Sequence, residues 1–193
     1  MFVDKEFIMN KSLKKETQVF IEDMTKLKDD PETADFTLKV NDKSFKVHKA
    51  VLGARSGVFR TMFLAGMKEA VEGEAVITDV DEETLQEVLH YIYTGKLSGK
   101  DFSINSLCYA AAKYQLDTLM DLIPEEIRKR KTELQAEEVA EVFISAEIFR
   151  NEKLFDVAMK KLRMNKSMMK EAKFKDKMNN ASREFLYKIM SSM

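Results

Sequence analysis

The chain has little of the residues that most often carry catalysis, disulfide bonds or membrane insertion. Its 193 residues include one cysteine, two histidines and no tryptophan. A single cysteine excludes an internal disulfide and fits a reducing compartment. No apolar run is long enough to cross a membrane, and residues 1–16 lack the continuous apolar core of a signal peptide. We therefore expect a cytoplasmic or nuclear protein that has no contact with membranes.

Basic and acidic residues are nearly equal in number. The sequence has 32 basic and 33 acidic residues, so its net charge is −1. This balance gives no overall attraction to nucleic acid. We interpret the lysines between residues 160 and 177 as a solvated helix face, and the alternative is contact with an acidic partner or nucleic acid. We expect no nucleic-acid partner. Apolar residues make up 45% of the chain, which is enough for a hydrophobic core.

Motifs of catalysis are also missing from the sequence. There is no glycine-rich phosphate loop and no nucleophile elbow of the GxSxG type. His48 lies where a strand gives way to a helix, and we expect it to lock the fold by hydrogen bonding. His90 and Cys108 lie in helical stretches, and neither histidine has the neighbours of a metal site. We therefore predict no catalytic residue, no metal site, no cofactor and no enzymatic activity.

A β-hairpin is predicted early in the chain. Apolar and polar residues alternate over residues 36–40, which is the pattern of a strand with one solvated face. Asn41-Asp42 supplies turn chemistry, and the alternation resumes over residues 45–47. The spacing therefore indicates two antiparallel strands joined by a tight turn.

The period then changes to that of helices. Apolar residues recur at helical offsets over residues 51–63, with a break at Ser56-Gly57. Residues 75–77 read as a short strand. Asp81 is a good N-cap for the next helix, and Gly95 ends it. This order predicts an α+β fold without the regular alternation of a doubly wound sheet.

Helices are also predicted on both sides of this region. From Thr17, apolar residues including Phe20, Met24 and Leu27 form a stripe at helical spacing, which ends before Pro31. After residue 132, two amphipathic helices follow. We divide the chain into a flexible lead (1–16), a helix and linker (17–34), a compact core (35–125) and a helical extension (132–193).

Several short stretches, in order along the chain, carry a family resemblance. They are Asp35-Phe36, residues 45–52 (FKVHKAVL), residues 54–56 (ARS), the pairs Val58-Phe59 and Met62-Phe63, residues 91–95 (YIYTG) and residues 110–114 (AAAKY). On these the sequence resembles the BTB/POZ domain, and within that family the MATH-BTB proteins of the speckle-type POZ group. The resemblance implies a small mixed sheet with surrounding helices.

The helical extension resembles the 3-box, the first helix pair of the BACK region in cullin-3 adaptors. The resemblance rests on the apolar positions and small residues of residues 136–162. It weakens further on, because the Gly-Trp that is typical of a later helix start is replaced by residues 171–174 (EAKF). The implied architecture is a BTB/POZ fold followed by an all-helical 3-box or BACK-like extension.

The resemblance also implies a dimer. In domains of this kind the leading helix packs on a second copy, and Phe20, Met24, Leu27 and Val51 stand at the matching positions. Burying side chains of this size yields roughly 1.5–3 kcal/mol each, which is enough for a symmetric patch to sustain a dimer. The alternative is a helix that lies on its own domain.

A cullin-3 site is implied as well. Adaptors of this family carry a hydrophobic residue, any residue and a glutamate in one loop, and Met67-Lys68-Glu69 fits that pattern. Phe63 belongs to the same patch or, equally, to the core. The residues expected to bind cullin-3 are Phe63, Leu64, Met67, Glu69, Tyr114, Asp117, Val142, Ala146 and Leu154.

The function implied by the resemblance is a dimeric adaptor that links a protein substrate to a cullin-RING ubiquitin ligase by proximity. Heterodimers with other BTB proteins are a further expectation. The alternative is a BTB self-association or hetero-association module, in transcription or scaffolding, that does not bind cullin. A substrate-binding MATH domain would precede residue 17, and we expect either a fragment of a longer protein or a short BTB form.

Overall fold

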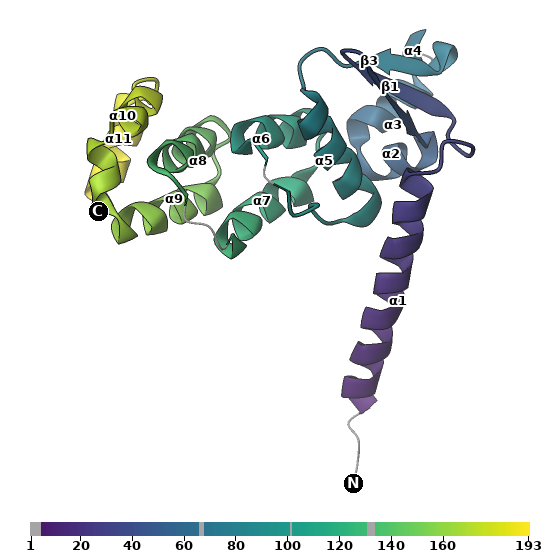
Figure 1. Cartoon of the computed structure of the whole chain (residues 1–193), viewed down its shortest axis with the longest axis horizontal. Helices are drawn as coiled ribbons and strands as arrows, with labels where there is room; N and C mark the ends of the chain where they lie inside the picture. The colour runs from purple at the N-terminus through teal and green to yellow at the C-terminus, as the bar shows by residue number, and fades with distance from the viewer. Residues whose placement is uncertain (1–4, 66–67, 101, 131–133) are drawn as a thin grey trace. The chain divides into compact units, whose positions relative to one another are not determined.

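The computed structural model describes residues 5–65, 68–100, 102–130 and 134–193, and the side chains of residues 5–11 lie outside this description. The chain forms two compact units, residues 1–100 and residues 101–193 (Figure 1). The elements of the first unit are α1 (Lys5–Lys28), β1 (Phe36–Val40), β2 (Lys43–Val47), α2 (Lys49–Arg55), α3 (Gly57–Leu64), α4 (Lys68–Glu72), β3 (Glu74–Val76) and α5 (Glu82–Thr94). Those of the second unit are α6 (Ile104–Lys113), α7 (Asp117–Lys129), α8 (Ala136–Ile148), α9 (Glu152–Met164), the 3-10 helix η1 (Lys166–Lys170), α10 (Ala172–Met178) and α11 (Arg183–Ser191).

The sheet of the first unit is small and mixed. β1 lies between β2, which is antiparallel to it, and β3, which is parallel to it. The apolar residues of β1 are buried, whereas Lys39 forms an ion pair with Glu74 of β3 at 2.7 Å. Asn41 makes the turn to β2 with a φ of 49°, a left-handed backbone that asparagine tolerates better than most residues. The predicted hairpin and the predicted α+β fold class are confirmed.

α5 carries the caps that the sequence predicts. The Asp81 side chain accepts a hydrogen bond from the backbone N–H of Thr84 at 2.7 Å, and Gly95 ends the helix with a φ of 71°. One face of α5 is apolar and buried, and it includes Leu85, Val88, Leu89 and Ile92. Because α5 packs against both α1 and α2, it sets the position of the surface that those two helices share.

α1 begins earlier than the sequence analysis expected. It runs from Lys5, whereas we predicted a flexible lead over residues 1–16 and a helix from Thr17. Residues 5–16 contain neither glycine nor proline, and their lysine, glutamate, methionine and leucine residues are good helix formers. The structure thus extends the helix into the expected lead. The other predicted segment boundaries stay predictions.

The second unit is built around an aromatic cluster, which we define as Phe143, Phe155, Phe174 and Phe185. The four rings come from α8, α9, α10 and α11 respectively. The fully buried Phe143 ring meets the other three edge to face, with centroid distances of 5.8 Å, 6.4 Å and 6.3 Å. Edge-to-face pairs add to the stabilisation from burial alone. The cluster therefore joins four helices through one side chain.

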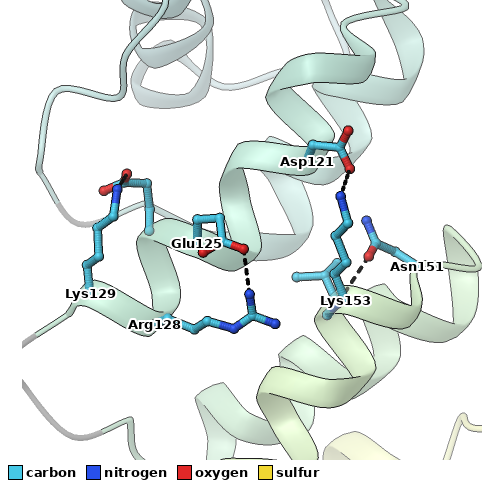
Figure 2. A network of polar contacts seen from close by, with 8 residues as sticks. Asp121, Glu125, Arg128, Lys129, Asn151 and Lys153 are labelled. Carbon is cyan, nitrogen blue, oxygen red and sulfur yellow. Dashed lines mark hydrogen bonds and ion pairs between the residues drawn. The ribbon is translucent and has the colours of Figure 1, made fainter. Parts of the chain in front are cut away.

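Polar contacts also join α7 to α9. Lys153 Nζ donates to Asp121 Oδ1 at 2.6 Å, and Figure 2 shows the two side chains extending toward each other. Asn151 caps α9, because its side chain accepts from the backbone N–H of Leu154 at 3.1 Å. The ion pair is solvent-exposed on both sides and so adds little stability. The buried side chains, not this pair, hold the two helices together.

Candidate interaction surfaces

A groove on the first unit combines residues from three helices. Phe20 and Met24 of α1, Val51 and Arg55 of α2, and residues 92–95 at the end of α5 line it, and its volume is ≈ 440 Å³. The Phe20 side chain is 61% exposed, although a large aromatic residue usually seeks burial. We call this feature the α1–α2 groove. It is an apolar surface with an exposed aromatic side chain at its edge.

The groove brings together most of the residues predicted for a dimer interface. Phe20, Met24 and Val51 all line it, although they are far apart in the sequence. Leu27 does not belong to the lining and is half-buried one turn further along α1. Their role in a dimer stays a prediction, since the structure contains one copy of the chain.

His48 forms hydrogen bonds with Tyr93, one of the residues that line the groove. Tyr93 Oη accepts a hydrogen bond from the backbone N–H of His48 at 3.0 Å and lies 2.7 Å from His48 Nδ1. Thr33 Oγ1 lies 2.9 Å from His48 Nε2 and donates to Asp30 Oδ2 at 3.1 Å. Because the Thr33 hydroxyl donates to Asp30, Nε2 of His48 is the donor to Thr33, and in the neutral ring Nδ1 then accepts from the Tyr93 hydroxyl.

This network confirms the predicted fold-locking role of His48. It ties the segment after α1 and the residue before α2 to Tyr93 near the end of α5, and Tyr93 is one of the residues that line the groove. Burial raises the pKa of the Tyr93 phenol, so its proton stays available for His48. The groove is therefore held in place by buried hydrogen bonds as well as by packing.

Replacing Tyr93 with phenylalanine will destabilise the protein. The change removes the acceptor for the His48 backbone N–H and the donor to Nδ1, and leaving such buried groups without partners costs about 1–3 kcal/mol. Urea unfolding followed by circular dichroism measures the loss. The exposed Tyr187 gives a matched control, since Tyr187→Phe should change little. Equal stability of the two variants would contradict the role assigned to the Tyr93 hydroxyl.

The segment predicted to bind cullin-3 lies around α3 and α4. Leu64, the last residue of α3, is 73% exposed, and Glu69 is half-buried in the first turn of α4. Phe63 is half-buried, and its ring packs against Phe36 with a centroid distance of 5.0 Å and stacks on Phe59 at 6.1 Å, so one side of it contacts the core. Met67 lies outside the described residues.

Two exposed apolar residues in this region were missed by the sequence analysis. Val71 of α4 is 81% exposed and Val76 of β3 is 65% exposed. α4 packs on both α3 and β3, so these valines and Leu64 lie on neighbouring elements. Adjacent residues of a strand point to opposite faces of the sheet. Because Ala75 is buried, its neighbour Val76 is exposed, and the alternation of β3 could have predicted this.

The remaining predicted cullin-3 residues belong to the second unit. Tyr114, Val142, Ala146 and Leu154 are all buried there, and Asp117 is exposed at the start of α7. The family resemblance suggested these residues for a cullin-3 contact, and in the structure the four buried ones lie on the core face of their helices. A role for the four buried residues would be to support a surface, not to form it.

The described part of the chain offers no cluster of three or more histidine, cysteine or acidic residues suited to a metal ion. Cys108 is buried, and burial raises the pKa of its thiol to about 12, so the reactive thiolate is scarce at neutral pH. Burial lowers the pKa of His90. No helix among the described residues is long and apolar enough to cross a membrane.

Comparison with known proteins identifies the class that this fold represents. The family model of the BTB/POZ domain matches residues 24–131, more than half of the chain. The chain belongs to the BTB/POZ domain family. Among solved structures, the BTB domain of zebrafish PATZ1 is similar at 23% sequence identity and a TM-score of 0.50, over 61% of this chain and 95% of that one. That likeness supports the fold.

Membership of this family defines the general role of the protein. BTB/POZ domains are non-catalytic modules for protein–protein interaction, and they commonly form homodimers. The matched residues begin within α1 at Met24 and extend into the second unit. The α1–α2 groove lies in the matched region except for Phe20. This chain is therefore a protein-interaction module with an additional helical extension.

Proposed function

We propose that the protein is a homodimeric adaptor that binds cullin-3 and links a protein substrate to a cullin-RING ubiquitin ligase. It performs no bond chemistry. It acts by raising the concentration of substrate near a ligase held elsewhere on the cullin, and two arms in one dimer add avidity. The proposal places the protein in the cytoplasm, the nucleus or both. Other BTB proteins with a matching groove are its candidate heterodimer partners.

The α1–α2 groove is the observation that carries the dimer. Phe20 and Met24 border the groove on one side, and both come from a helix whose residues 12–20 are exposed. A surface that holds a groove and an exposed aromatic side chain together can fit a second copy of itself in an isologous, two-fold contact. Leu27 would lie at the margin of that contact.

Two features support cullin-3 as the partner. Met67-Lys68-Glu69 fits the family's hydrophobic-any-glutamate pattern, and the exposed Leu64 precedes it. An aliphatic side chain that fills a pocket on its partner can anchor an interface. The α8–α9 pair, which resembles the 3-box, is the second feature. The proposal also extends to the finer resemblance, with MATH-BTB proteins of the speckle-type POZ group.

Titration with the N-terminal domain of cullin-3, with light scattering to count subunits, tests the proposal. We expect a two-to-two complex. Changing Met67 and Glu69 together to alanine removes an apolar anchor and a polar contact, and should weaken binding by about 30-fold or more, the size of a hot-spot loss. Lys68→Ala is the matched control, because Lys68 is exposed between the two changed residues.

A stable dimer that ignores cullin-3 would overturn the adaptor function. The chain would then be a self-association or hetero-association module, and the search would turn to longer BTB proteins that share its groove. A double variant that dimerises normally and still binds cullin-3 as tightly as the native chain would remove Met67 and Glu69 from the site.

A further inference from the structure

Arg55 stands apart from the rest of the α1–α2 groove. It is the charged side chain in a lining that is otherwise apolar or uncharged among the described residues. Its guanidinium carbon lies 5.4 Å from the centroid of the Tyr91 ring, so stacking orients the group. Between described residues, Arg55 makes no ion pair within 4.0 Å. Among the described residues, no carboxylate of the chain itself therefore pairs with the positive charge that Arg55 brings to the groove.

α1 carries the matching charge on one border of its apolar face. Residues three, four and seven apart share a face of a helix, so Leu13, Phe20 and Leu27 align with Met24 close beside them. Glu16, four residues before Phe20, and Asp23, three residues after it, lie together along one side of this stripe. Both carboxylates are exposed. We call Glu16 and Asp23 the acidic border.

The acidic border is free to meet a partner. Asp23 Oδ1 accepts from Lys26 Nζ at 2.9 Å, and both side chains are largely exposed. Surface pairs of this kind are weak and exchange readily. Among described residues Glu16 has no ion pair. On the other side of the stripe stand Thr17 and Lys28, so the two borders of the helix differ in charge.

We propose that Arg55 pairs with the acidic border of a second copy, and that this charge match selects the partner of the α1–α2 groove. The inference rests on the proposed dimer and adds its specificity. When the apolar stripe of α1 that contains Phe20 binds in the groove of the other copy, Glu16 and Asp23 beside the stripe come close to Arg55 of that copy. Two-fold symmetry then forms the contact twice. A BTB partner with basic residues at the two acidic positions is rejected by like-charge repulsion.

A charge-swap experiment tests the pairing. One variant carries Arg55→Glu, and the other carries Glu16→Lys with Asp23→Lys. Each variant alone places like charges together in both halves of its dimer, so self-association should weaken by roughly tenfold or more. Mixed in equal amounts, the two variants place opposite charges together in both halves, and association should recover. Native mass spectrometry at physiological salt separates the homodimers from the heterodimer by mass.

Controls separate this inference from the proposed function. Lys15→Glu reverses a charge on the opposite side of α1 and should leave the dimer unchanged, and thermal unfolding checks that every variant folds. A native chain that is monomeric would overturn the dimer itself. A dimeric native chain whose variants self-associate equally well, or whose weakened variants do not recover on mixing, would overturn the charge match and leave the dimer standing.

Discussion

Aspartate at both Phe20 and Met24 will leave the protein folded and monomeric. Both side chains line the α1–α2 groove, Phe20 is 61% exposed and Met24 is half-buried, and neither is among the buried core residues of the single chain. Burial at an interface contributes roughly 1.5–3 kcal/mol for each such side chain, and the two-fold contact loses each of them twice. Two carboxylates in an apolar contact add a desolvation cost. The loss is large enough to remove a dimer at micromolar concentration.

Size-exclusion chromatography with light scattering measures the subunit count. Val19→Asp is the matched control, because Val19 is exposed on α1 but does not line the groove. The control should remain dimeric, and thermal unfolding should show that all three proteins are folded. A dimer that survives both aspartates would show that the chain associates through another surface.

Replacing Phe143 with alanine is expected to have the largest effect on stability. Phe143 is fully buried and is the ring that meets the other three members of the aromatic cluster. Deleting a buried aromatic side chain costs about 3–5 kcal/mol, because burial is lost and a cavity remains. That is a large fraction of the stability of a typical domain. The second unit should therefore unfold at markedly lower urea concentration.

Urea unfolding followed by circular dichroism suits a chain that has no tryptophan. Ile148→Ala, at the exposed end of the same helix, is the control and should change the free energy of unfolding by less than about 0.5 kcal/mol. A similar small loss for Phe143→Ala would mean that the four helices do not depend on the cluster for their packing.

Local patterns predicted the parts of the fold that depend on nearby residues. The hairpin turn at Asn41, the Asp81 cap and the Gly95 end are set by backbone geometry within a few residues, and all three were found. The order of short family stretches predicted the BTB/POZ fold, which the family comparison bears out. The start of α1 was not predicted, because residues 5–16 are mixed in polarity and the prediction relied on the apolar stripe that follows Thr17.

Surfaces were harder to predict than elements. Helical spacing shows that Val142, Ala146 and Leu154 share faces, but it does not show whether a face meets the core or a partner, and all three are buried. Phe63 illustrates the same limit, since its ring packs on Phe36. The α1–α2 groove depends on α1, α2 and α5 meeting in space. The family resemblance could name Phe20 and Val51, but not the position of Arg55 beside them.

The small sheet has a consequence for how the protein behaves in a crowded cell. β2, at one edge, carries the exposed Lys43 and Lys46, and β3, at the other, is three residues long. Short or lysine-bearing edges give an incoming strand little to pair with. Fibre growth by addition of strands is therefore disfavoured at both edges of the sheet.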